Sequence, residues 1–311
     1  MRYFSRAYRG LSDLPSGIEL KQAITRARLP TYYHPGDFVW QLYAFDETDD
    51  VRLWFDGEMA IACAIFEPPL TFQFAVHPDA DAQRGLETEI LDWVEHRRML
   101  VGAHPEIPLA YQQLGDDALA TNTLASDVDR AEMLRRNGFT RHGPAGIRYA
   151  CALDGALPEV ELPEGAAFRE LTDEDVEARA ELHREAWSVW GPSDHHTERY
   201  RRLRRAPLYR SDLDVVLEFE GRLVSYCVCW LDVVNRVGHF EPVGTHHAFV
   251  RRGFGRAVVR EGMRRLRERG MQTATVGTAS VNLAAQRLYA SAGFEVVDTE
   301  DWYRKTSAGL A

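Results

Sequence analysis

The stretch Arg252-Gly-Phe-Gly-Arg-Ala257 sets two glycines directly before a long amphipathic segment. The apolar or small residues that follow recur at the spacing of one helical face, and Gly270 then provides a natural stop. These residues are Val258, Val259, Gly262, Met263 and Leu266. A β-prone run, Phe240–His246, precedes the glycines, and Thr273–Thr278 has the composition of a further strand. The order predicted is therefore strand, glycine loop, helix and strand.

This layout favours a binding site for an anion of the pyrophosphate type. The N-terminus of a helix supplies backbone N–H groups without partners and a partial positive charge. Gly253 and Gly255 carry no side chain that would block close approach, and Arg252 and Arg256 can add positive charge. Tight strand–helix turns often contain glycine, so the flanking strand and helix carry most of the argument.

Two motifs in this order resemble those of the GNAT superfamily of acyl-CoA-dependent N-acetyltransferases. The loop of that family has the pattern Arg/Gln-x-x-Gly-x-Gly/Ala, and Arg252, Gly255 and Ala257 stand at those positions. The segment Asn282-Leu-Ala-Ala-Gln-Arg-Leu-Tyr-Ala-Ser-Ala-Gly-Phe294 is similar to the family's Asn…Leu-Tyr…Gly-Phe helix. The resemblance implies an α/β fold, a mixed and twisted sheet with helices on both faces. Its strands are expected to splay in the middle.

The resemblance also implies acetyl-CoA as co-substrate. The loop residues expected to hold it are Arg252, Gly253, Phe254, Gly255, Arg256 and Ala257. On the strand before the loop, Val243, Gly244 and Thr245 are expected to hydrogen-bond the pantetheine arm. Asn282 could cap its own helix or contact the same arm, and both interpretations stay open.

Amide formation requires a base and an acid. The acceptor amine must lose a proton before it attacks the thioester, and the departing thiolate gains from receiving one. The resemblance places Tyr289 near the CoA sulfur, which makes it the expected acid; the alternative is that it only packs against the sheet. Glu241 is the expected base, acting directly or through water, although an acid before a proline at a strand bend can be purely structural. His246 and His247 are fallback bases.

The chain repeats its own plan in two halves. Residues 153–165 are rich in proline, glycine and acidic side chains, which predicts a linker. On each side of it, a hairpin, a strand, a helix and a short helix ending in Gly-Phe follow in the same order. The predicted organisation is a tandem of two GNAT-like domains, 1–152 and 166–311, with catalysis in the second.

The first half departs from the pattern where the anion would bind. When Arg84–Glu89 is aligned with the second-half loop, Glu87 and Glu89 stand where that loop has glycine and alanine. Like charges near a phosphate are strongly disfavoured in a partly desolvated site. Counted back from the shared Gly-Phe, Leu134 replaces the tyrosine and Asp127 the asparagine. The first domain is therefore expected to be degenerate and non-catalytic.

The composition excludes several other classes of protein. The chain has 311 residues, of which 45% are hydrophobic and 27% charged, as in a soluble protein long enough for two domains. A net charge of −10 gives no support to a nucleic-acid partner. The chain has no apolar run of membrane-spanning length, and the polar N-terminus does not resemble a signal peptide, so a cytoplasmic location is expected. The cysteines Cys63, Cys151, Cys227 and Cys229 lack metal-site spacing, so we expect reduced thiols and no metal.

The sequence leaves the acyl acceptor open. The leading hypothesis is a primary amine of a small molecule or peptide, and the excess of acidic residues favours a cationic one. Trp187, Trp190 and Tyr200 could line its pocket or belong to the core. The alternatives are a tandem acyltransferase of the mycothiol-synthase type and a non-catalytic acyl-CoA-binding sensor or scaffold. Neither the acyl chain length nor the oligomeric state is determined by the sequence.

Overall fold

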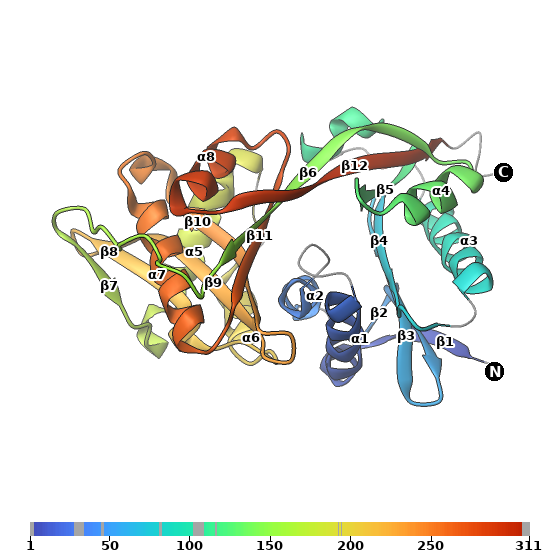
Figure 1. Ribbon diagram of the computed structural model, residues 1–311, viewed down its shortest axis with the longest axis horizontal. Helices are drawn as coiled ribbons and strands as arrows, with labels where there is room; N and C mark the ends of the chain where they lie inside the picture. The colour runs from blue at the N-terminus through green and yellow to red at the C-terminus, as the bar shows by residue number, and fades with distance from the viewer. Residues whose placement is uncertain are drawn as a thin grey trace. The chain divides into compact units, whose positions relative to one another are not determined.

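The computed structural model describes residues 3–27, 34–44, 47–80, 83–101, 109–115, 117–191, 193 and 195–306. The chain forms two compact units, whose elements are labelled in Figure 1. Unit 1 comprises Met1–Arg28, Phe45–Ile147 and Asp298–Ala311, and unit 2 comprises Leu29–Ala44 and Arg148–Val297. Among the described residues, no helix is long and apolar enough to cross a membrane.

These units differ from the predicted domains at both ends of the chain. The segment 34–44 lies in unit 2, whereas the predicted bounds assign it to 1–152. The last strand, β12 (Glu295–Thr306), belongs to unit 1 from Asp298 onward. Its residues 300–306 pair antiparallel with β5 (Ala118–Leu124). The predicted bounds miss this exchange because strand pairing between distant parts of a chain leaves no local pattern in the sequence.

Unit 1 is built on a sheet in the order β1-β2-β3-β4-β5-β12. Its other strands are β1 (Phe4–Arg9), β2 (Glu47–Asp56), β3 (Met59–Glu67) and β4 (Thr71–Val76). Its helices are η1 (Gly10–Asp13), α1 (Leu14–Ala27), α3 (Gln83–Val101), η2 (Leu109–Leu114) and α4 (Val128–Arg136). Helices α1 and α3 both contact β3 and β4. The hairpin predicted around Asp56-Gly57 is present, but Arg84–Glu89 lies inside α3 and not in a loop before it.

Unit 2 is a mixed sheet in the order β6-β11-β10-β9-β8-β7. Its strands are β6 (Thr140–Ala152, in unit 2 from Arg148), β7 (Ala166–Arg169), β8 (Asp214–Phe219), β9 (Arg222–Asp232), β10 (Val237–Thr245) and β11 (Thr273–Ala279). Its α-helices are α2 (Pro35–Leu42), α5 (Val176–Trp187), α6 (Thr197–Leu203), α7 (Phe254–Glu268) and α8 (Leu283–Ala292). Its short 3₁₀ helices are η3 (Asp173–Asp175), η4 (Ser188–Trp190), η5 (Ser211–Leu213) and η6 (His247–Phe249). Strand β10 runs parallel to β11 and antiparallel to β9, so the predicted mixed α/β sheet is confirmed.

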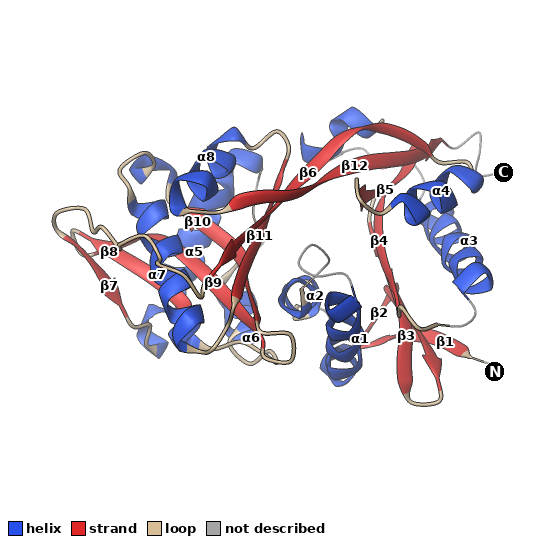
Figure 2. Cartoon of the chain, viewed as in Figure 1, coloured by secondary structure: helices blue, strands red, loops and turns tan. Residues whose placement is uncertain are grey.

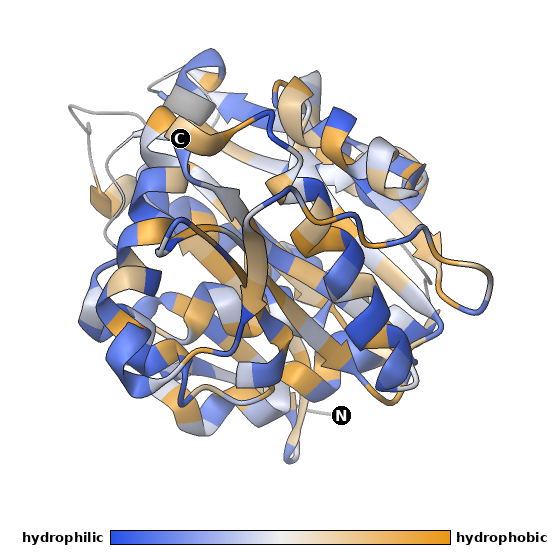
Figure 3. Cartoon of the chain, turned by 90° about the vertical axis from the view of Figure 1, so that its left-hand side faces the viewer, coloured by the Kyte–Doolittle hydropathy of each residue, from blue (hydrophilic) through white to orange (hydrophobic). Residues whose placement is uncertain are grey.

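The side chains of β9 alternate between two helical layers, which Figure 2 shows in blue around the red strands. Cys227 and Cys229 face α7, and the Cys227 thiol lies 3.2 Å from the carbonyl oxygen of Val258. Their neighbours Tyr226 and Trp230 face the opposite layer, formed by α5 and α2. Both cysteines are buried free thiols on one face of the strand, as predicted. Figure 3 shows mainly hydrophobic colour on the central strands and alternating hydrophobic and hydrophilic colour along the helices around them.

The predicted linker lies along α7. Residues 153–165 contain no helix or strand. Arg260 donates a hydrogen bond to the carbonyl oxygen of Glu159 at 2.8 Å, and Arg256 forms an ion pair with Glu161 at 3.1 Å. These contacts fix the segment against the helix that follows the glycine motif.

Close packing at Gly262 holds α7 against the sheet, and we predict that Gly262→Ala destabilises the protein. A methyl group at this position would lie 2.5 Å from the ring of Phe240 and 2.8 Å from Cys229 Sγ. Alanine favours a helix over glycine by about 1 kcal/mol, but overpacking costs about 1–3 kcal/mol. We expect the melting temperature to fall by roughly 2–8 °C in a thermal unfolding experiment. Gly155→Ala is the control, since a methyl group there meets no atom within 4 Å. An unchanged or higher melting temperature for Gly262→Ala would contradict this account.

Candidate active site

The candidate site lies where β10 leaves its parallel neighbour. In the described residues, the β10–β11 ladder runs from Val237↔Thr273 to Phe240↔Val276 and does not continue beyond that pair. The ladder with β9 shifts register between Phe240 and Val243 and then continues to Thr245. One edge of β10 therefore diverges from the sheet over its last residues. Backbone N–H and C=O groups on such an edge can hydrogen-bond an extended ligand as another strand would.

The N-terminus of α7 lies beside the end of this strand. Gly253 caps the helix in the left-handed region, with φ of +87°, where a side chain would strain the backbone. A methyl group on Gly255, in the first turn, would lie 3.2 Å from Thr245 Oγ1 and 3.4 Å from Leu288. The end of β10 and the first turn of α7 thus converge on one small space. The helix has 15 residues, so its unpaired N–H groups carry the partial positive charge of a full macrodipole.

The two arginines of the motif have other contacts. The Arg252 guanidinium carbon lies 4.4 Å from the ring centroid of Phe219, 5.1 Å from that of Phe254 and 5.6 Å from that of Phe249. Arg256 is paired with Glu161, as described above. Their side chains therefore stabilise the loop and the preceding segment in this structure. Any anion would be held mainly by the backbone of the helix N-terminus.

Glu241 stands at the point where β10 and β11 separate. Its carbonyl oxygen accepts a hydrogen bond from Trp230 Nε1 at 2.6 Å, which fixes the backbone at the bend. Burial raises the pKa of its carboxyl group to about 8; the charge of Asp37 acts in the same direction and that of Arg148 against it. A carboxyl group with a pKa in this range can accept and release a proton near neutral pH.

Tyr289 lies on α8, and its ring is almost fully buried. The ring centroids of Tyr149 and Phe294 lie 5.7 Å and 6.1 Å away. Burial, and then the charge of Glu241, raises the pKa of the Tyr289 hydroxyl well above its usual range. This hydroxyl therefore carries its proton at neutral pH. At the start of the same helix, Asn282 accepts the Ala285 N–H at 3.1 Å, so the structure shows the capping role that the sequence left open.

Sequence reasoning missed a set of charged groups around Glu241. Asp37 Oδ1 and His239 Nε2 lie 2.8 Å apart, which is hydrogen-bond distance. On the other side of the ring, His239 Nδ1 lies 2.8 Å from Thr275 Oγ1. Burial would raise the pKa of the Asp37 carboxyl, but His239 and Arg148 hold it well below the usual range. The spacing of His239 and Glu241 was a usable signal, because residues two apart on a strand share a face.

The aromatic residues proposed for an acceptor pocket divide between core and surface. Tyr200 belongs to the core, where its hydroxyl donates to Asp214 at 2.8 Å. Trp187 donates from Nε1 to the Tyr226 hydroxyl at 3.0 Å, and the same hydroxyl lies 2.7 Å from His183 Nδ1. Trp190 is exposed. Pro192 and Asp194, in the turn that follows Trp190, lie outside the described residues.

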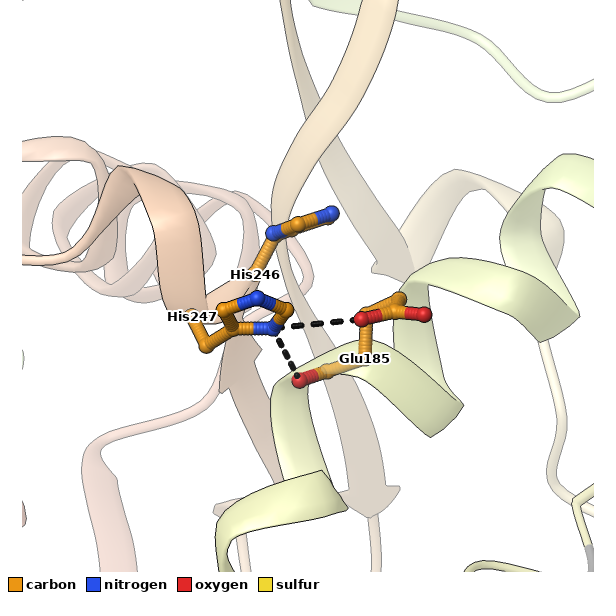
Figure 4. Close-up of side chains that lie close together, drawn as sticks. All are labelled: Glu185, His246 and His247. Carbon is orange, nitrogen blue, oxygen red and sulfur yellow. Dashed lines mark hydrogen bonds and ion pairs between the residues drawn. The ribbon is translucent and has the colours of Figure 1, made fainter.

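The His246-His247 pair, which looked isolated in the sequence, has Glu185 beside it (Figure 4). His247 Nδ1 lies 3.1 Å from Glu185 Oε2. The three side chains are close enough to share a cation, but the hydrogen bonds favour another arrangement. His246 accepts the Ala248 N–H at Nδ1, so its proton resides on Nε2, and His247 Nδ1 donates to Glu185.

In unit 1, the position that corresponds to the glycine motif is filled by a hydrogen-bonded carboxylate. Glu89 accepts a bond from Trp54 Nε1 at 2.8 Å and one from Ser5 Oγ at 3.3 Å. Asp127 caps α4 as Asn282 caps α8. Leu134, which aligns with Tyr289, is fully buried in the core.

Comparison with known proteins agrees with this geometry. Residues 177–294 match the family model described as the acetyltransferase (GNAT) family. The second half of the chain contains a GNAT acetyltransferase domain. The resemblance found in the loop and in the Asn282–Phe294 segment is therefore confirmed.

Relatives and solved structures extend the match beyond this domain. A mycothiol acetyltransferase of Saccharomonospora viridis is 26% identical over 250 residues, covering 76% of this chain and 74% of its own. A GCN5-related N-acetyltransferase from Sphaerobacter thermophilus superposes with a TM-score of 0.64 at 20% identity, covering 98% and 96% of the two chains. A tandem GNAT protein from the clavulanic acid biosynthesis pathway gives a TM-score of 0.62 at 15% identity, covering 98% and 99%. The fold is that of tandem GNAT proteins, and acyl transfer is the general activity supported.

We predict that acetyl-CoA binds at one site per chain and that Gly255→Glu abolishes this binding. The larger side chain would fill the space between Thr245 and Leu288 and bring a negative charge to the helix N-terminus. Isothermal titration calorimetry of the full chain measures both the stoichiometry and the loss. Glu87→Arg on α3 is the matched variant of unit 1 and should leave affinity and stoichiometry unchanged. Two sites in the wild-type protein would show that unit 1 also binds the co-substrate.

Proposed function

We propose that unit 2 transfers an acetyl group from acetyl-CoA to a primary amine of a small molecule or peptide. The observation that carries this proposal is the position of Glu241 and Tyr289 at one place, the separation of β10 from β11. The charge of Glu241 raises the pKa of the Tyr289 hydroxyl, and the Tyr289 ring packs against Phe294, which in turn contacts Phe240 on β10. A base and an acid beside an open strand edge and a helix N-terminus are the groups that acyl transfer to an amine requires.

The residues near the two glycines support acetyl-CoA as co-substrate. The first turn of α7 offers backbone N–H groups to a pyrophosphate, and Gly255 leaves space for it beside Thr245. Val243, Gly244 and Thr245 pair with β9 on one edge, which leaves the other edge for the pantetheine arm. The hydrogen-bonded Glu89 and the buried Leu134 support a non-catalytic unit 1.

The proposed mechanism is direct transfer without a covalent enzyme intermediate. Acetyl-CoA, when bound, supplies the acetyl group as a thioester, which the amine attacks with loss of the thiolate. Glu241 accepts the proton that the ammonium form of the acceptor must lose, directly or through water. Tyr289 holds a proton at neutral pH and donates it to the leaving sulfur. The N–C bond forms as the C–S bond breaks. The nitrogen loses its second proton as it becomes an amide, and this proton returns, directly or through water, to the oxygen of Tyr289. Solvent then takes the first proton from Glu241.

We predict that Tyr289→Phe lowers kcat by about 10²-fold or more and leaves the affinity for acetyl-CoA nearly unchanged. The substitution removes only the hydroxyl and keeps the ring that packs against Tyr149 and Phe294. Release of free CoA thiol in the presence of a panel of amines measures turnover, and calorimetry measures affinity. Tyr149→Phe is the control for loss of a neighbouring hydroxyl. Full turnover by Tyr289→Phe would remove this residue from the mechanism.

We predict that kcat/KM rises with pH through an apparent pKa of about 8. The raised pKa means that the Glu241 carboxyl is protonated below this value and becomes a base above it. Since kcat/KM reports the free enzyme, its acid limb should follow this titration. In Glu241→Gln, the acid limb of the kcat/KM profile at about pH 8 should disappear. Only the pH dependence caused by titration of the acceptor amine should then remain. If the acid limb at about pH 8 survives in this variant, it belongs to another group, and Glu241 is not the base.

A second candidate, a mycothiol-type acyltransferase, is favoured by one observation. The relative that is 26% identical and shares three quarters of the chain is a mycothiol acetyltransferase. Turnover with the acceptor of that relative, greater than with any simple amine, would establish this narrower function. Acetyl-CoA binding without turnover of any acceptor would instead favour a sensor or scaffold.

A further inference from the structure

Helix α2 comes from the first half of the chain and packs on β9 and β10 of unit 2. His34 caps it by accepting the Gly36 N–H at Nδ1, 2.9 Å away. Its proton is therefore on Nε2 and is donated to the carbonyl oxygen of Val237 on β10, at 3.1 Å. A methyl group on Gly36 would lie 2.3 Å from the Trp230 ring, so glycine is required for this approach. Gly36 thus allows the start of α2 to pack closely against β9.

This docking brings Asp37 to the strand that carries Glu241. Asp37 completes the capping box of α2 by accepting the His34 N–H at Oδ2, 3.2 Å away. Its other oxygen pairs with His239. One side-chain ligand atom from each of Asp37, His239 and Glu241 lies within 4.8 Å of the others. Two carboxyl groups are therefore held within a few ångströms of each other in a largely buried place.

We propose that Asp37 is a positioning residue that sets the proton affinity of Glu241, by fixing His239 and by holding a negative charge beside the Glu241 carboxyl. The inference rests on the proposed role of Glu241 as base. A nearby like charge disfavours ionisation of a carboxyl group, and a stronger proton affinity makes a stronger base. An element from the degenerate half of the chain would in this way tune the catalytic half.

The charged and titratable groups around Glu241 come from several elements. Asp37 on α2 raises its pKa, and Arg148 on β6 lowers it. His239 precedes it on β10, and Tyr289 on α8 and Tyr226 on β9 respond to its charge. Arg148 reaches this place across β11, where a methyl group on Gly277 would lie 2.7 Å from its guanidinium. Asp37 and Arg148 therefore shift the pKa of Glu241 in opposite directions. A general loss of structure would not shift this pKa up in one variant and down in the other.

The test is a carbon-13 NMR titration of glutamate side-chain carboxyl groups in the full-length protein without ligand. One carboxyl resonance should titrate near pH 8 in the wild type and be absent from Glu241→Gln. In Asp37→Asn its midpoint should move to lower pH, so that the ratio of protonated to ionised Glu241 at about pH 8 falls roughly threefold or more. In Arg148→Gln the midpoint should move to higher pH. Asp173→Asn removes the same charge from an exposed side chain and should leave the midpoint unchanged.

The outcomes separate the two proposals. If Glu241→Gln removes no resonance that titrates near pH 8, the assignment of Glu241 as base fails, and this inference fails with it. If the resonance is present but Asp37→Asn and Arg148→Gln leave it unmoved or shift it the same way, only the inference is overturned. Asp37→Ser keeps an oxygen for the His34 N–H and replaces Asp37→Asn if that variant unfolds. Displacement of the Glu241 proton by added Zn²⁺ would also overturn the inference, because the three side chains would then be a metal site.

Discussion

The rest of unit 2 depends on the change of partner that β10 makes after Phe240. Up to that residue both edges of the strand are hydrogen-bonded, and after it the described ladder continues with β9 alone. The separation opens one edge of Val243–Thr245 and places the end of the strand beside the first turn of α7. It also leaves Glu241 at the junction, held by its carbonyl bond to Trp230. One local failure of parallel pairing thus brings together an open strand edge, a helix N-terminus and a buried carboxyl group.

Unit 2 contains two buried groups of charged side chains, and they differ in how completely opposite charges are paired. Arg179 and Asp214 are both almost fully buried, 3.0 Å apart, and two tyrosine hydroxyls also bond the carboxylate. This ion pair joins α5 to β8 and anchors the helix to the sheet. Around Glu241, by contrast, two carboxyl groups share His239 and Arg148. Incomplete compensation of charge is what keeps a proton exchangeable there.

Features that depend on neighbouring residues could be predicted from the sequence. The glycine motif, the apolar stripe of α7 and the hairpins each lie within a short window, and each is found in the structure. Residues 153–165 contain no helix or strand, but they lie inside unit 2 and not between the two units. Asp37 and Arg148 could not be predicted, because they reach Glu241 from segments that lie about 200 and about 90 residues away in the sequence. The pairing of β12 with β5 in unit 1 could not be predicted for the same reason. Only the two-residue spacing of His239 and Glu241 hinted at a larger cluster.

The two units share the features that stabilise the fold and differ at the position of the glycine motif. Asp127 and Asn282 cap equivalent helices, and a Gly-Phe pair ends both, because these features serve folding in either unit. The anion site differs, since Glu89 is bonded within unit 1 where the other unit has its loop. Yet the halves are not independent. The residues 166–311 alone lack α2, Arg148 and Tyr149, all of which lie in unit 2 and surround Glu241 or Tyr289. Unit 2 therefore extends beyond the second half of the sequence, because residues of the first half complete the surroundings of Glu241 and Tyr289.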